Sequence, residues 1–274
     1  MPHFTTSDGL NIYYEDDGDG LPILCLPGLT RTTADFDYVT PHLAGNRVIK
    51  IDYRGRGQSD FDATWQNYNL QVEGRDVLEL LAHLGLAKTA ILGTSRGGMI
   101  GMGLAAMARD HLLGVALNDI GPEINPTGIA FIMVYLGRNP AARSHAEAAA
   151  ALKHVFADFE DVPEERWLRE AQKNYIQTDD GLQITYDPKL REATEAMASQ
   201  PALDLWPFFD ALQGLPTACI RGANSQLFTQ ETLDRMKERR PDMITAVVPG
   251  RGHVPFLDEP EAVEALHKWV ELMK

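Results

Sequence analysis

Short, mainly apolar runs alternate with amphipathic stretches along most of this chain. Residues 22–26 and 113–118 are almost wholly apolar, which is typical of strands buried on both faces of a sheet. Residues 70–84 instead repeat apolar positions at helical spacing, with one apolar stripe. Strands that alternate with helices in this way build a parallel sheet covered by helices on both faces. The pattern therefore predicts an α/β fold with a mostly parallel, doubly wound sheet.

The bounds of the individual elements follow from the same pattern. The expected strands cover residues 3–6, 10–15, 22–26, 47–51, 90–93, 113–118, 217–220 and 244–248. The expected helices of this part cover residues 36–43, 70–84, 99–108, 203–212, 229–239 and 260–273. The first two strands are separated by the turn residues Ser7-Asp8-Gly9 and are expected to lie at an edge of the sheet.

The alternation stops between residues 123 and 201. No strand pattern is visible there, and four helical stretches follow one another, at 127–136, 144–156, 162–175 and 188–197. The first of them is apolar nearly all round, so we expect it to be buried on more than one side. An all-helical block inside an alternating chain indicates an insertion. We therefore expect a core domain from residues 1–122 and 202–274, with residues 123–201 as a helical cap.

A turn between a strand and a helix carries the first chemical motif. The apolar run that ends at Gly93 leads through Thr94, Ser95 and Arg96 to Gly97, and a helix-compatible run begins at Met99. This matches G-x-S-x-G, in which a serine stands on a strained turn and needs small neighbours two positions away. The following helix directs its free N–H groups and positive dipole end toward the serine. The motif alone does not decide the chemistry, because Gly/Ser turns between strand and helix also occur without it.

Three further segments accompany this motif. They are Leu-Pro-Gly-Leu at 26–29, Asp-Tyr-Arg-Gly-Arg-Gly-Gln-Ser-Asp at 52–60 and Gly-Arg-Gly-His-Val-Pro-Phe at 250–256. In their order and in their loops after expected strands, the four segments resemble the α/β-hydrolase family over nearly the whole chain. The resemblance implies an eight-stranded α/β-hydrolase fold, with the serine after the fifth strand and a helical cap after the sixth.

A histidine and an acid are expected to work with Ser95. His253 lies just past the last strand, and an imidazole that titrates near neutrality can take up and return a hydroxyl proton. Many members of the family carry an aspartate in the loop after the seventh strand, but here that loop holds Asn224 and Gln226 and no carboxylate. The other placement known in the family is the end of the sixth strand, where this chain has Asp119. Asp119 is therefore the expected acid.

Other interpretations of the acid stay open at this point. Asn224 or Gln226 could orient the imidazole through an amide oxygen, but neither could stabilise its positive charge. Glu123 and Asp258 are weaker carboxylate candidates, and Asp258 is better placed to serve the start of the last helix. Asp119 itself could instead cap the turn that follows it.

The resemblance also implies an oxyanion hole made of backbone N–H groups. One donor is Arg96, directly after the serine, and the other is Leu29, in the loop after the third strand. The loop at 52–60 is expected to buttress the Leu29 loop. In the first cap helix, Phe131 and Tyr135 are expected to line a pocket for the acyl group.

The amino-acid composition limits the classes of partner that this chain is expected to bind. The 274 residues include 25 Lys and Arg against 39 Asp and Glu, and the net charge of −14 disfavours binding to nucleic acid or to anionic membranes. Arg31 and Arg96 add local positive charge that suits either an anionic substrate or salt bridges. Cys25 and Cys219 lie in apolar runs and are expected to be buried thiols. Since no export signal and no membrane-spanning run is visible, we expect a cytoplasmic monomer or homodimer.

Together these features predict a serine hydrolase that needs no cofactor and no metal. The expected substrate is a small carboxylic ester or lactone with an apolar acyl or alkyl part, attacked by Ser95. C–C bond hydrolysis and perhydrolysis use the same three residues and stay open, whereas dehalogenases and epoxide hydrolases need a carboxylate in place of the serine. Outside enzymes, a ligand-binding sensor of the same fold is the alternative, and measured turnover separates the two.

Overall fold

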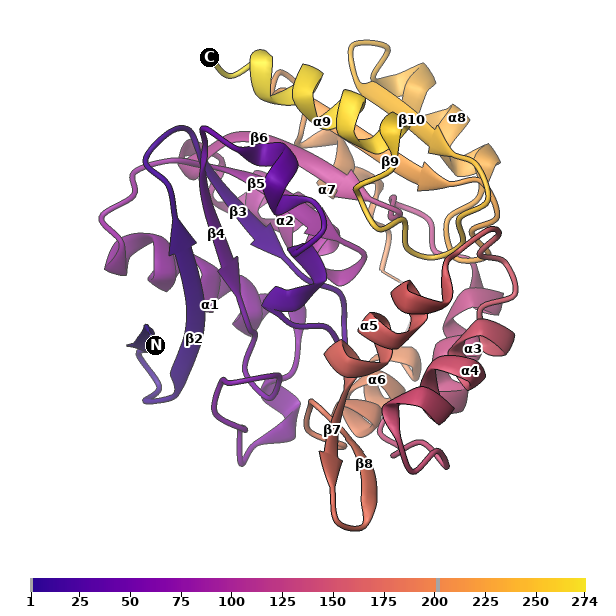
Figure 1. The fold of residues 1–274 in the computed structure, drawn as a ribbon. Helices are drawn as coiled ribbons and strands as arrows, with labels where there is room; N and C mark the ends of the chain where they lie inside the picture. Colours follow the sequence, from indigo (N-terminus) through magenta and orange to yellow (C-terminus); the bar gives the residue numbers. More distant parts are fainter. Residues whose placement is uncertain (1, 201–202) are drawn as a thin grey trace.

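An eight-stranded sheet forms the centre of the protein, which the computed structural model describes at residues 2–200 and 203–274 (Figure 1). Its strands are β1 (His3–Thr5), β2 (Asn11–Asp17), β3 (Pro22–Leu26), β4 (Arg47–Ile51), β5 (Thr89–Thr94), β6 (Leu112–Asn118), β9 (Thr217–Gly222) and β10 (Ile244–Val248). They lie in the order β1-β2-β4-β3-β5-β6-β9-β10. β2 pairs antiparallel with β1 and β4, and all the other pairings are parallel. The predicted α/β fold with a mostly parallel sheet is confirmed.

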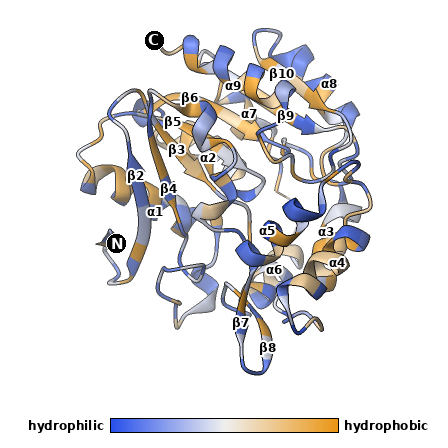
Figure 2. Ribbon diagram, in the orientation of Figure 1, coloured by the Kyte–Doolittle hydropathy of each residue, from blue (hydrophilic) through white to orange (hydrophobic). Residues whose placement is uncertain are grey.

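Helices cover both faces of this sheet because its inner strands are apolar on both. Along β3, Leu24 and Leu26 face one core, while Ile23 and Cys25 face the other. The first core is completed by α1 (Leu70–His83), α2 (Arg96–Met107), α7 (Trp206–Asp210) and α8 (Gln230–Arg239). The second is completed by α9 (Pro260–Glu271) and by two short 3₁₀ helices, η1 (Thr33–Phe36) and η2 (Thr40–Leu43). Figure 2 shows the strands at the centre of the sheet as mainly apolar.

Most strands and helices of the sheet and its two covering layers begin and end within three residues of their predicted bounds. The helix expected at 36–43 does not form. Its place is taken by the two 3₁₀ helices. Pro41 lies inside the expected helix, where it removes a backbone N–H donor and clashes with the preceding turn. The two cysteines are buried free thiols, as predicted. Among the described residues, no helix combines the length and apolar character needed to cross a membrane.

A second group of elements, which we call the cap, lies together on one side of the sheet (Figure 1). It consists of α3 (Pro126–Tyr135), α4 (His145–Val155), α5 (Glu164–Asn174), β7 (Tyr175–Thr178), β8 (Gly181–Ile184) and α6 (Leu190–Ala198). β7 and β8 pair as an antiparallel hairpin, so the prediction that this segment holds no strand is wrong. Asp179 and Asp180 form the turn between these two strands, and Gly181, the first residue of β8, adopts a φ of 126°.

The end of the cap is bonded to the loop that follows β4. The backbone N–H of Gly57 donates to Thr185 O over 2.7 Å, and that of Asp187 donates to Gly55 O over 2.8 Å. The Tyr68 hydroxyl adds a hydrogen bond of 2.6 Å to the Asp187 carboxylate. These three bonds hold one side of the cap against the core.

The turn between β5 and α2 leaves no room for extra atoms. Ser95 adopts φ 50° and ψ −111°, a conformation that residues with a side chain rarely take. A Cβ atom on Gly97 would lie 2.0 Å from Leu26 O of the neighbouring strand β3. A Cβ atom on Gly93 would lie 2.5 Å from the backbone of Gly97. The close approach of α2 to β3 therefore requires both glycines of the motif.

We expect Gly97→Ala to lower the free energy of unfolding by more than about 4 kcal/mol, because the backbone must move to relieve a contact with a carbonyl oxygen. Gly103→Ala in the same helix is the matched control, since a Cβ atom there meets nothing within 4 Å. That change should stabilise the protein by about 0.5–1 kcal/mol. Urea unfolding followed by circular dichroism measures both, and equal effects would contradict the steric explanation.

Candidate active site

Loops at the carboxyl ends of β5, β6 and β10 bring Ser95, Asp119 and His253 together. His253 Nε2 lies 3.0 Å from Ser95 Oγ, and His253 Nδ1 lies 2.7 Å from Asp119 Oδ2. The strands run parallel in this part of the sheet, so their carboxyl ends meet at one edge. An imidazole held between a hydroxyl and a buried carboxylate can accept the hydroxyl proton, and the carboxylate then stabilises the resulting positive charge.

The carboxylate of Asp119 is fixed by two groups from the end of β9 and the loop that follows. Oδ1 accepts the Gly222 N–H over 2.8 Å, and Oδ2 accepts the Ser225 hydroxyl over 2.6 Å as well as the histidine. Asp119 is fully buried, and its φ of 54° is unusual for a residue with a side chain. Ser225 was not among the predicted site residues, although its position between two polar residues, in the loop where many family members carry the acid, was a usable signal.

The two amides considered as substitutes for the acid lie elsewhere. Asn224 Nδ2 donates to Asp158 O over 2.9 Å and to Glu160 Oε1 over 3.1 Å, so it joins this loop to the cap. Gln226 lines a cavity that also contacts His253, but among the described residues the two side chains form no hydrogen bond.

The two weaker carboxylate candidates are engaged in ion pairs away from the histidine. Glu123 pairs with Arg235 over 2.6 Å. Asp258 pairs with Arg166 of α5, also over 2.6 Å, so it joins the cap to the core. The expectation that its side chain serves the start of the last helix is wrong. Glu259 takes the place before that helix, and its carboxylate accepts the backbone N–H groups of Phe256 and Leu257.

The two expected oxyanion donors lie beside Ser95. A Cβ atom on Gly28, which precedes Leu29, would be 4.0 Å from the Ser95 Cβ, and Leu29 lines the same small cavity as Ser95. The Leu29 N–H donates to no acceptor within the described part of the chain. Arg96 is the first residue of α2, so its N–H has no partner inside the helix. Both N–H groups therefore lack a backbone acceptor among the described residues, and their role as oxyanion donors stays a prediction.

The loop at 52–60 supports the Leu29 loop, as the sequence analysis expected. Arg56 is fully buried and donates from Nε to Leu29 O over 2.9 Å. Asp52 accepts the backbone N–H groups of Thr33 and Gln58 over 2.7 and 2.9 Å. Burial raises the pKa of Asp52 to about 6, although these two N–H groups act against the shift.

Two small cavities border His253 on the side of α3, and a larger groove adjoins them through shared residues such as Tyr135 and Phe156. One of about 50 Å³ contacts both Ser95 and His253, and one of about 100 Å³ lies between His253 and Phe131. A groove of about 290 Å³ extends from there between α3, α4 and the β7–β8 hairpin. Phe156 lines all three and was missed, because a phenylalanine at the end of an amphipathic helix has no pattern that separates it from a core residue.

The first cap helix, α3, borders these cavities but is less buried than expected. Phe131 lines the cavity next to His253, while Tyr135 and Ile132 line the one next to Ser95. Phe131 and Tyr135 are 38% and 37% exposed, and Val134 is 66% exposed. The prediction that this helix is buried on more than one side is wrong. It packs on the core through Ile129 and Ile132, and its other apolar side chains face the cavities, the groove and solvent.

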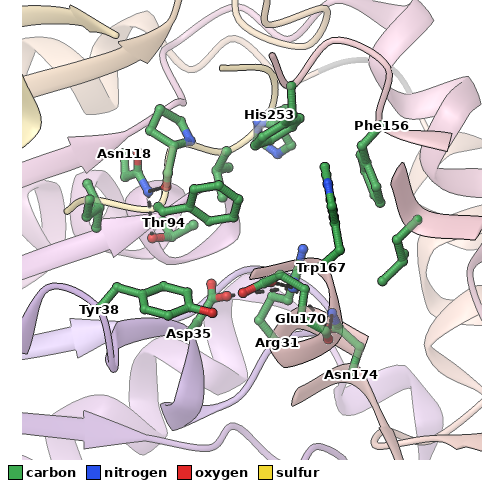
Figure 3. Close-up of a pocket in the computed structure, with 16 residues that line it drawn as sticks. Arg31, Asp35, Tyr38, Thr94, Asn118, Phe156, Trp167, Glu170, Asn174 and His253 are labelled. Atoms are coloured by element: carbon green, nitrogen blue, oxygen red, sulfur yellow. Dashed lines mark hydrogen bonds and ion pairs between the residues drawn. The ribbon is translucent and has the colours of Figure 1, made fainter. Parts of the chain in front are cut away.

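The two arginines near the site point in different directions. Arg31 lines a cavity with His253 and donates to Asn174 over 3.0 Å and to Glu170 over 3.3 Å, both on the cap helix α5 (Figure 3). The Arg96 side chain is buried and pairs with Glu73 in the core. Of these two arginines, Arg31 is therefore the one whose side chain borders the cavities.

Comparison with known proteins places this geometry in a family. The family model for the alpha/beta hydrolase fold matches residues 22–260, which include all four sequence motifs. The chain belongs to the α/β-hydrolase family. This membership confirms the resemblance that the motifs indicated.

Two relatives are similar to this α/β hydrolase over most of their length. The 3-hydroxybutyrate-oligomer hydrolase of Cupriavidus necator is 36% identical over 251 residues, which cover 88% of this chain and 85% of that protein. The crystal structure of an α/β hydrolase from Novosphingobium aromaticivorans has a TM-score of 0.92 and 36% identity, over 98% of this chain and 97% of that one. These relatives support an enzyme. In residues 2–200 and 203–274 of this α/β hydrolase, no group of three His, Cys, Asp or Glu side chains is placed to hold a metal ion.

We expect Asp119→Asn to lower turnover by about 10⁴-fold without unfolding the protein, because the imidazole would lose both its orientation and its stabilising charge. Gln226→Ala should cost far less, and Ser225→Ala should cost an intermediate amount because it removes one of the bonds that hold Asp119. Steady-state kinetics on a p-nitrophenyl ester, with circular dichroism as the folding control, measures all three. A larger loss in Gln226→Ala than in Asp119→Asn would show that the acid is misassigned.

Proposed function

We propose that this protein is a cofactor-free serine hydrolase that cleaves carboxylic esters through an acyl-enzyme. The observation that carries the proposal is the unbroken hydrogen-bond chain from Ser95 Oγ through the His253 ring to the buried carboxylate of Asp119. Ester hydrolysis also requires donors for the carbonyl oxygen, which becomes negatively charged during attack, and the free N–H groups of Leu29 and Arg96 are the candidates for this role.

The reaction follows from the positions of these groups. Ser95 Oγ attacks the ester carbonyl carbon while His253 Nε2 takes the hydroxyl proton, and Leu29 and Arg96 donate to the oxygen of the tetrahedral intermediate. When the C–O bond breaks, Nε2 returns the proton to the leaving alcohol oxygen. A water molecule then attacks the acyl-enzyme with His253 again as the base, which releases the carboxylic acid and restores Ser95. Asp119 holds Nδ1–H throughout and stabilises the imidazolium.

The groove supports a substrate with an apolar chain and a free carboxylate. Its lining is mainly apolar, with the two arginines Arg31 and Arg138 and with no aspartate or glutamate. Arg138 is exposed, and within the described residues its guanidinium has no hydrogen-bond or ion-pair partner. A short oligoester of a hydroxy acid, as named for the Cupriavidus relative, combines ester bonds, an apolar chain and one terminal carboxylate. We propose esters of this class as the substrate.

We expect a fluorophosphonate to label Ser95 covalently, because the histidine activates its hydroxyl toward an electrophilic phosphorus centre. Ser95→Ala should abolish both the labelling and the turnover of short p-nitrophenyl esters. His253→Ala should lose on the order of 10⁶-fold in turnover, about as much as Ser95→Ala, since the members of such a triad act as a unit. Peptide mass spectrometry identifies the labelled residue. Binding of an ester without turnover by the unmodified protein would favour a ligand sensor instead.

We expect Arg138→Gln to raise KM for a dimer or trimer of 3-hydroxybutyrate while leaving KM for the methyl ester of the same oligomer unchanged. The reason is that only the free acid offers a carboxylate to the guanidinium. Arg143→Gln is the matched control, because Arg143 is also an exposed arginine of the cap but does not line the groove. Equal effects of the two variants, or of the acid and its methyl ester, would mean that Arg138 does not bind the carboxylate.

A further inference from the structure

A buried carboxylate of α1 lies behind the site and bonds to two arginines at once. Glu73 Oε1 accepts from Arg56 Nη1 over 2.8 Å, and its Oε2 accepts from Arg96 Nε over 2.5 Å. Glu73 and Arg56 are fully buried, and Arg96 is 3% exposed. None of these three side chains is reached by the hydrogen-bond chain of Ser95, His253 and Asp119.

Each of the two arginines is connected with one of the expected oxyanion donors. Arg56 bonds to Leu29 O through Nε, so it fixes the residue whose N–H is one donor. Arg96 carries the other donor on its own backbone, and its side chain also bonds to Tyr68 O over 3.2 Å. The two donors come from separate loops, after β3 and after β5, and Glu73 is the group that the two arginines share.

The charges explain why a carboxylate is needed at this point. Burial alone would raise the pKa of Glu73, but the two guanidinium groups more than offset it and lower the pKa, so Glu73 is ionised. Without that negative charge, Arg56 and Arg96 would repel each other in a part of the core that water does not reach. The two loops would then lose the anchor that sets the distance between them.

We propose that Glu73 is a positioning residue that fixes Leu29 N–H and Arg96 N–H relative to each other, and so shapes the oxyanion hole. The proposal rests on the proposed function, since it assigns Glu73 to that site. Oxyanion stabilisation acts in the transition state far more than in substrate binding, so a fault in this hole lowers kcat and leaves KM nearly constant. A carboxylate with only a structural role would change stability and leave kcat of the folded protein unchanged.

The test compares Glu73→Gln with Asp76→Asn. Asp76 lies one turn further along α1, is equally buried and forms a two-point ion pair with Arg54 at 2.7 Å, but that ion pair does not contact Leu29 or Arg96. Unfolding free energy, kcat and KM for a p-nitrophenyl ester, and the rate of fluorophosphonate labelling are measured for both variants. Both should lose stability. Only Glu73→Gln should lose kcat and labelling rate, on the order of 10- to 100-fold, with KM nearly unchanged.

A second variant covers the case in which Glu73→Gln does not fold. Arg56→Lys keeps a positive charge next to Glu73 but removes the planar group that bonds to Glu73 and Leu29 O together, so it should lower kcat in the same way. Full kcat in either folded variant, or an equal loss in Asp76→Asn, would overturn the positioning role. The unmodified protein tests the proposed function separately: if it neither turns over an ester nor is labelled, the proposed function itself is contradicted.

Discussion

The close approach of α2 to strand β3 is the constraint on which the rest of the site depends. Gly97 lies against the Leu26 carbonyl with no space for a side chain, and this contact brings the start of α2 to the loop that leaves β3. The serine and the Leu29 loop can share one small cavity only because these two backbones touch. The strained backbone of Ser95 is a direct result of the same contact, since the chain must turn within a few residues.

The order of strands in the sheet determines how the acid can reach the histidine. β6 lies between β5 and β9, so the loop after β6 lies next to both the serine and the loop after β9. From this position Asp119 bonds to His253 and Ser225 through Oδ2 and to the Gly222 N–H through Oδ1. The loop after β9 therefore contributes to the site through a hydroxyl and a backbone N–H, although it holds no carboxylate.

The local sequence was sufficient to predict the structure where a single segment sets the geometry. It was not sufficient to predict the contacts between segments that are distant in the chain. The glycines around Ser95, the apolar strands and the loop of His253 are each readable within about ten residues, and the motif order placed them in one fold. The bond between Arg56 and Leu29 joins residues 27 positions apart, and the one between Glu73 and Arg96 joins residues 23 apart. No spacing rule predicts such contacts.

The β7–β8 hairpin was missed because its strands are four residues each, too short to show alternation. The exposed face of α3 was mistaken for a buried one because an apolar groove and a hydrophobic core need the same residues.

The bonds that join residues 185–187 of the cap to the loop after β4 link access to the site with its reactivity. Gly55 and Gly57, which bond to this end of the cap, flank Arg56, which in turn holds the Leu29 carbonyl. A movement that lifted this side of the cap would pull on the same short loop and would displace Leu29. The side of the cap around α3 and α4 borders the groove, and the segment that follows α4 is bonded to the core through Asn224. The position of this end of the cap is therefore coupled, through Arg56, to the loop that holds Leu29 next to Ser95.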